Sequence, residues 1–130
     1  MNRHPWLRGQ TGAPLGQSCL PDDYMAAAKG FDLAASIHVE ANWDPADPLG
    51  ETGWLDTLAR PEGIATRYVA FADLASESAC AVLEAHAAHE RVVGVRDIVS
   101  WHPDPARSAV KDRRRMRDPA WRTGLARLER

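Results

Sequence analysis

The chain contains little cysteine and no long apolar run. Cys19 and Cys80 are the two cysteines among 130 residues, too few to indicate a disulfide framework. No stretch approaches the roughly 20 apolar residues that a membrane-spanning helix requires. No apolar segment of the signal-peptide type follows the early Arg3 and Arg8. These absences predict a reduced, cytoplasmic protein that has no membrane partner.

The sequence also lacks an excess of positive charge. Sixteen Lys and Arg residues against 18 Asp and Glu give a formal net charge of −2. This balance predicts no nucleic-acid partner, because binding to a phosphate backbone requires clustered positive charge. One basic run contains Lys111, Arg113, Arg114, Arg115 and Arg117, and no aromatic residues are interleaved with it. We therefore interpret this run as a solvated loop.

The common short motifs of catalysis are missing as well. The sequence has no zinc-finger spacing, no His-Glu-x-x-His helix, no Gly-rich phosphate loop and no Ser nucleophile elbow. The chemistry of the residues alone therefore indicates no more than an α/β domain with a possible His/Glu/Arg site.

Repeated start and stop signals organise the chain into one domain, residues 1–130, whose first 20 residues are irregular. Helices are predicted to begin at Pro21, at Pro48 after the cap Asp47, directly after the cap Ser76, and at Pro119 after the cap Asp118, because a small polar cap or a first-turn proline stands at each place. Short apolar strands are predicted near 36–41, 67–72 and 92–98.

These elements alternate, and the strands recur about every 30 residues, as β/α units do. The predicted fold class is therefore α/β, with three parallel strands and four helices. A small open sheet and a part of an eight-stranded (β/α)8 TIM barrel are both compatible with this pattern. A complete barrel needs about 250 residues, so the length excludes it.

In a parallel α/β sheet, ligands bind at the carboxyl ends of the strands. The first predicted strand ends with His38 and Glu40, which lie two residues apart and so point to the same side. Facing into a barrel, this pair could bind a metal ion or a polar substrate. A buried, hydrogen-bonded pair is the alternative interpretation.

The other two strands end with Asp73 and with Arg96, which Trp101 follows. An arginine fork at a strand end can hold a substrate carboxylate or a lactone carbonyl. Alternatively, Arg96 pairs with Asp97 or Glu40 in a structural role, and Asp73 introduces the next loop. His86 and His89 have metal-compatible helical spacing, but a helix outside the sheet predicts surface histidines.

Several longer strings carry a resemblance. SIHVEANWDPADPLGETGWLDTLA (36–59), YVAFADL (68–74), GVRDIVSWHPD (94–104) and DPAWRTGL (118–125), with HPWL (4–7), resemble the amidohydrolase-related family. These proteins are TIM-barrel, metal-dependent hydrolases that include sugar-lactone lactonases. The resemblance implies strands two, three and four of such a barrel, with His38, Glu40, Asp73, Arg96 and Trp101 at its substrate-facing end.

The resemblance also implies a divalent metal cofactor, zinc or manganese, and a lactone or related cyclic ester or amide as substrate. The family's metal ligands lie on strands that find no match in this sequence, so we expect this chain to bind no metal and to be inactive alone. The alternative function is a small non-catalytic α/β binding module that self-associates into a homo-oligomer.

Overall fold

A computed structural model describes residue 4 and residues 17–129. Among these residues there are four α-helices and one sheet, of three parallel strands in the order β1-β2-β3. The strands are β1 (Ile37–Val39), β2 (Arg67–Phe71) and β3 (Val92–Arg96), and the helices are α1 (Pro21–Ala27), α2 (Gly50–Thr57), α3 (Ala79–Ala87) and α4 (Pro119–Ala126). The predicted α/β class and the parallel pairing are confirmed. Most of the predicted irregular segment, residues 1–3 and 5–16, lies outside the described residues.

Two of the predicted helix starts are confirmed. Pro21 opens α1, with Asp22 and Asp23 in its first turn. The Asp118 side chain caps α4 by accepting a hydrogen bond from the backbone N–H of Ala120. Carboxylates stabilise these positions because the first N–H groups of a helix have no partner within the helix.

The predicted starts of α2 and α3 were wrong. Helix α2 begins at Gly50, because Asp47 takes part in a preceding turn in which the Gly50 N–H donates to the Asp47 carbonyl at 3.0 Å. Helix α3 begins at Ala79 rather than directly after Ser76, whose hydroxyl accepts a hydrogen bond from the Ser78 N–H. In both cases the polar residue closes a turn before the helix instead of capping it.

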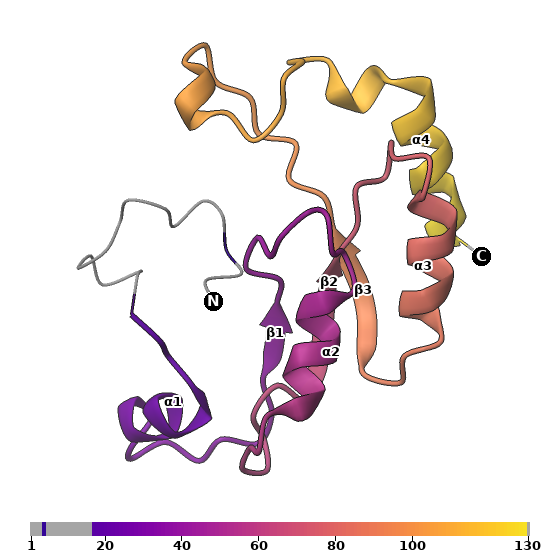
Figure 1. Cartoon of the computed structure of the whole chain (residues 1–130). Coiled ribbons are helices and arrows are strands. Elements are labelled where there is room, and N and C mark those ends of the chain that lie inside the picture. The colour runs from indigo at the N-terminus through magenta and orange to yellow at the C-terminus, as the bar shows by residue number, and fades with distance from the viewer. Residues whose placement is uncertain (1–3, 5–16, 130) are drawn as a thin grey trace.

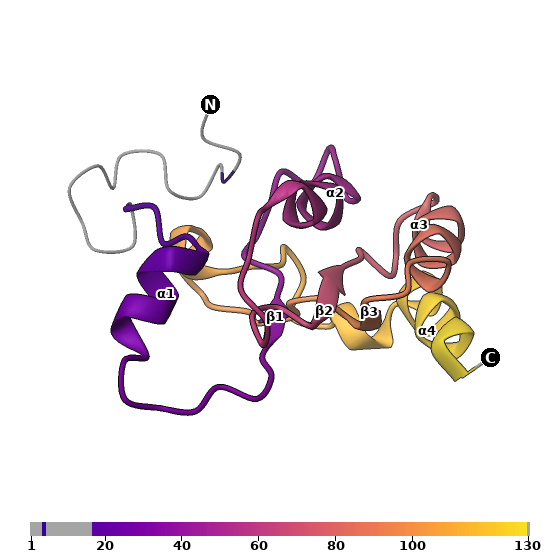
Figure 2. The same ribbon diagram turned by 90° about the horizontal axis from the view of Figure 1, so that it is seen from below.

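Helices α2 and α3 lie on one side of the sheet, and α4 lies beside α3 (Figures 1 and 2). Leu55 of α2 and Tyr68 of β2 form one apolar cluster with Ile64 and Ala65. A second buried cluster joins Ala72, Leu74 and Val82 to Trp121 of α4. The core therefore occupies the space between the sheet and these three helices.

No α-helix of the described residues covers the other face of the sheet (Figure 2). Ile37, Val39 and Val93 are exposed by 58%, 45% and 57%. We call this apolar surface the open face. Ile37 and Val39, which alternate with His38 along β1, therefore lie on the open face although the strand is apolar. The outer edges of β1 and β3 also have no partner strand among the described residues.

We expect the chain to self-associate through the open face, because solvated apolar surface of this kind favours burial at roughly 25 cal/mol per Å². The variant Ile37→Lys/Val93→Lys should shift the population toward monomer in light scattering coupled to size-exclusion chromatography. Phe31→Lys is the matched control, since Phe31 is 81% exposed but lies outside the sheet. A wild-type monomer at all concentrations would contradict this prediction.

Candidate functional site

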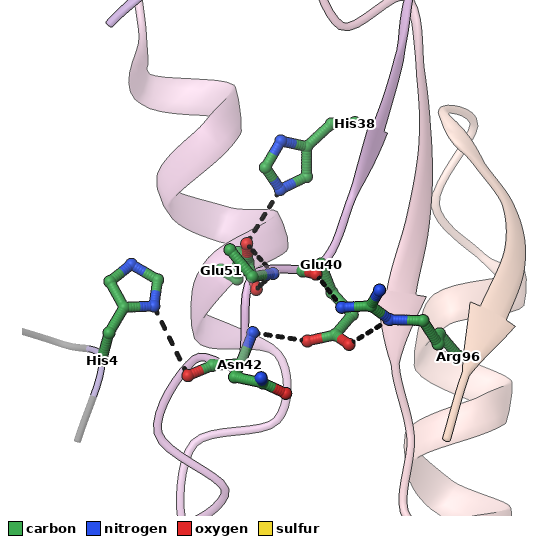
Figure 3. A network of polar contacts seen from close by, with 7 residues as sticks. His4, His38, Glu40, Asn42, Glu51 and Arg96 are labelled. Atoms are coloured by element: carbon green, nitrogen blue, oxygen red, sulfur yellow. Dashed lines mark hydrogen bonds and ion pairs between the residues drawn. The ribbon is translucent and has the colours of Figure 1, made fainter. Parts of the chain in front are cut away.

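An ion pair joins β3 to the end of β1 across the carboxyl edge of the sheet. The Nε of Arg96 donates to Oε1 of Glu40 at 2.5 Å, and an Nη2–H donates to the Glu40 carbonyl, also at 2.5 Å (Figure 3). Glu40 is 1% exposed in its side chain, whereas Arg96 is 40% exposed. The pair therefore consists of a buried carboxylate and a guanidinium that still reaches solvent.

The Glu40 carboxylate is held from both sides. Its Oε2 accepts the Asn42 N–H at 2.7 Å, while Oε1 binds Arg96. Asn42 has a φ of 55°, a left-handed conformation that asparagine tolerates better than most residues. The left-handed turn at Asn42 thus directs a backbone N–H at the carboxylate. Of the two interpretations left open by the sequence, the pairing of Arg96 with Glu40 is the one observed.

His38 lies on the helix-covered side of the sheet, not on the open face. Its Nε2 is 2.8 Å from Oε1 of Glu51, in the first turn of α2 (Figure 3). The Glu51 carboxylate also accepts the Ala41 N–H, at 2.9 and 3.2 Å from its two oxygens. Of the two interpretations left open for the His38/Glu40 pair, the hydrogen-bonded one is observed for His38, because α2 supplies a buried carboxylate on this side of the sheet.

A second charged group forms where β2 and β3 end. Asp97 accepts the Trp121 indole N–H at 2.9 Å and the Leu74 N–H at 3.2 Å. Arg115 pairs with Asp73 and lies 3.7 Å from the same Asp97 oxygen. These contacts tie the loop after β3 and helix α4 to the carboxyl edge of the sheet.

The interpretation of the basic run as a solvated loop was therefore wrong for Arg115, whose side chain is 22% exposed and ion-paired. Arg113, Arg114 and Arg117 are exposed, as expected. Trp101 follows β3 with 43% exposure. The structure thus brings Glu40 and Arg96 together at one end of the sheet and ties Asp73 to Arg115. Among the described residues, no hydrogen bond or ion pair joins the Trp101 side chain to either pair.

His86 is buried with 2% exposure, so the prediction of a surface histidine was wrong. Its Nε2 lies 3.0 Å from the Phe71 carbonyl, which links α3 to β2. Burial lowers the pKa of His86 below the usual 6.5, and the hydrogen bond to Phe71 opposes this only in part. His89 is half-buried and pairs with Asp56 of α2 at 2.6 Å.

We expect the stability of the chain to fall as the pH drops below about 6.5, because the unfolded state then binds a proton that folded His86 does not. The loss continues until the pH passes the lowered folded-state pKa, with a slope of at most about 1.4 kcal/mol per pH unit. Denaturant unfolding of wild type and His86→Gln between about pH 8 and pH 5 measures this effect. Equal slopes for the two proteins would rule out His86 as the cause.

Sequence reasoning missed Glu51, Asp56 and Tyr68. The Tyr68 hydroxyl donates to Asp56 at 2.9 Å, and burial together with this bond raises the pKa of Tyr68. Burial alone would raise the pKa of Asp56, but the hydrogen bonds from His89 and Tyr68 lower it overall. This group lies away from the carboxyl edge and links α2, β2 and the start of β3. The available signal was that two carboxylates, Glu51 and Asp56, lie in α2, the helix that follows the first strand.

Within residue 4 and residues 17–129, no group of three or more His, Cys, Asp or Glu side chains is arranged to hold a metal ion. The Glu40 carboxylate is held by Arg96 and by the Asn42 N–H, and His38 is hydrogen-bonded to Glu51 of α2. In the same part of the chain, no helix has the length and apolar character needed to cross a bilayer.

Comparison with known proteins gives one relative of note. The chain is 29% identical to the uncharacterized protein y4mH of Sinorhizobium fredii over 136 residues. The match includes 99% of this chain but 46% of y4mH, so the chain spans less than half the length of this relative. No family model matches the chain, and no solved structure does.

Proposed function

We propose that this chain is part of a metal-dependent hydrolase of the amidohydrolase type, inactive on its own, that acts on a lactone or a related cyclic ester or amide. The observation that supports this most is the gathering of charge at the carboxyl ends of three adjacent parallel strands. Glu40, Asp73, Arg96 and Asp97 all lie there. This edge is where parallel α/β enzymes bind their substrates.

The open face gives a second line of support for a larger assembly. Ile37, Val39 and Val93 are exposed on it, and the sheet has two unpaired outer edges among the described residues. A parallel sheet is normally buried on both faces. Further β/α units that close the sheet into a TIM barrel would cover this face and both edges. The greater length of y4mH is consistent with such additional units.

In this proposal Arg96 binds the substrate. Its Nε and Nη2 hold Glu40, and its 40% exposure leaves Nη1 available to a carboxylate or carbonyl oxygen at the strand ends. A guanidinium donates hydrogen bonds but does not transfer a proton near neutral pH. Glu40 orients Arg96, while Asp73 and Trp101 border the same edge.

A divalent metal such as zinc or manganese would polarise the carbonyl or activate water in this type of hydrolase. The described residues do not fit such an ion, since a catalytic zinc site uses three protein ligands and no such group is present among them. We therefore derive no metal-dependent step from this chain.

The proposal is tested by adding, in trans, the part of y4mH that lies outside the matched region. We expect a one-to-one complex in light scattering, and we expect Ile37→Lys/Val93→Lys to weaken it at least tenfold, while Phe31→Lys has no effect. If the chain does not bind this segment and remains a homo-oligomer, the result supports the alternative function, a non-catalytic module that self-associates. The exposure of the open face is the observation that favours this alternative.

A further inference from the structure

A pocket of about 210 Å³ lies beside β1 on the helix-covered side of the sheet, between α1 and α2. Its walls include Leu20, Tyr24, Trp54 and Leu58, with His38 and Arg60 among the polar side chains. An apolar cavity of about 150 Å³ holds benzene. This pocket therefore has room for a single ring that carries one or two small substituents.

Cys19 and Tyr24 also line the pocket, and two of its other polar side chains, Arg60 and Ser36, are engaged within the protein. The Arg60 Nη1 donates to the Leu55 carbonyl at 3.0 Å, and its guanidinium lies over the Tyr68 ring. The Ser36 hydroxyl donates to the Gly63 carbonyl and accepts the Ala65 N–H. Neither side chain is therefore arranged to select a ligand.

His38 differs because one of its two nitrogens remains available. Its Nε2 faces the Glu51 carboxylate at 2.8 Å, which favours the tautomer that carries the proton on Nε2. Glu51 is 5% exposed and is itself held by the Ala41 N–H, so the ring orientation is fixed. Nδ1 is then a hydrogen-bond acceptor, and it lies on the side of the ring away from Glu51 (Figure 3).

We propose that this pocket binds a small single-ring phenol or alcohol. The ring occupies the apolar space between α1 and α2, and the hydroxyl donates a hydrogen bond to Nδ1 of His38. Apolar walls with one oriented polar group are typical of small-molecule sites. Most of the residues that line the pocket lie on the helix-covered side of the sheet, although Ile37 also lines it. The test below uses neither the open-face variants nor y4mH, so its outcome is separate from that of the proposed hydrolase function.

The test compares p-cresol with p-xylene, two molecules of nearly the same shape of which only the first has a hydroxyl. Dissociation constants are measured for the whole chain from amide chemical shifts in 1H–15N spectra. We expect p-cresol to bind about five- to tenfold more tightly than p-xylene, the gain from one hydrogen bond. His38→Phe should bring this ratio to about one while it preserves p-xylene binding. Equal affinities in the wild type, or an unchanged ratio in His38→Phe, would overturn the proposal.

A second pair of variants tests the location independently of His38. Leu20→Trp adds bulk to the pocket wall, and Met25→Trp makes the same change on α1 at a residue that does not line the pocket. We expect Leu20→Trp to weaken both ligands at least tenfold and Met25→Trp to leave them unchanged. Binding that survives in Leu20→Trp, or that is lost equally in both variants, places the ligand elsewhere and refutes the assignment.

Discussion

Replacing Arg96 with methionine is expected to lower the free energy of unfolding by about 3 kcal/mol, because it leaves the Glu40 carboxylate buried without its partner. The Glu40 side chain is 1% exposed and loses two hydrogen-bonded contacts with Arg96, one at its carboxylate and one at its carbonyl. Methionine keeps much of the apolar stem of arginine, so the loss of stability measures the contribution of the guanidinium group. The partial exposure of Arg96 keeps the effect below the upper end of the range for buried pairs.

The matched control is Arg67→Met, the same change at an exposed position on the neighbouring strand β2. Its effect should stay within about 0.5 kcal/mol, as for most surface substitutions. Adding Glu40→Gln to Arg96→Met should recover part of the stability, because no buried charge then remains. Urea unfolding followed by circular dichroism measures all four proteins. If Arg96→Met and Arg67→Met lower the free energy of unfolding equally, Arg96 does not stabilise the sheet through Glu40.

The same variant separates a binding role from a structural one once the protein is catalytically active. If Arg96 also holds substrate, Arg96→Met raises KM by a factor equivalent to about 1–3 kcal/mol, with little change in kcat per folded molecule. If its role is limited to Glu40, activity follows the folded fraction and KM is unchanged. Melting temperature and kinetics are measured on the same preparation.

Gly124→Ala is expected to destabilise the chain by about 2–4 kcal/mol, because a Cβ at this position would lie 2.0 Å from the Leu74 carbonyl oxygen. The obstacle is backbone, so it cannot move aside as the end of a side chain would. Helix α4 must shift away from the loop after β2, which loosens the packing of Trp121 and its hydrogen bond to Asp97.

Gly53→Ala is the control for this substitution. Gly53 lies inside helix α2, and nothing stands within 4 Å of the position its Cβ would take. Alanine is the better helix former, so we expect a gain of about 0.5–1 kcal/mol. A result in which both variants gain stability would show that α4 does not pack closely against the Leu74 backbone.

The sequence predicted the framework of the fold because the framework depends on local signals. Apolar β-branched runs marked all three strands, and Pro21 and Asp118-Pro119 marked two of the helices. In helix α3, Ala79, Val82 and His86 are buried, whereas the sequence predicted His86 to lie at the surface. Alanines lie on every side of this helix, so the sequence shows no clear apolar stripe. Histidine counts as polar in a hydrophobicity pattern, so such a pattern does not predict that His86 is buried.

The arrangement of the site was less predictable because it depends on long-range contacts. That Arg96 binds Glu40 requires β1 and β3 to flank β2, although the two residues lie 56 positions apart in the sequence. That His38 turns toward α2 depends on Glu51, which is buried only after α2 packs on the sheet. Spacing showed that these residues are near strand ends, but not which face each side chain takes.

The most direct measurement is the rate of acid release from sugar lactones, followed in a pH-stat with zinc or manganese present. The chain, the unmatched part of y4mH, and the two together are compared at equal concentrations. The proposed function predicts hydrolysis above background for the mixture and none for either part alone, with Arg96→Met shifting KM in the mixture. A well-formed complex with no hydrolysis of any lactone would contradict the lactonase assignment, and no complex at all would contradict the completion of a barrel.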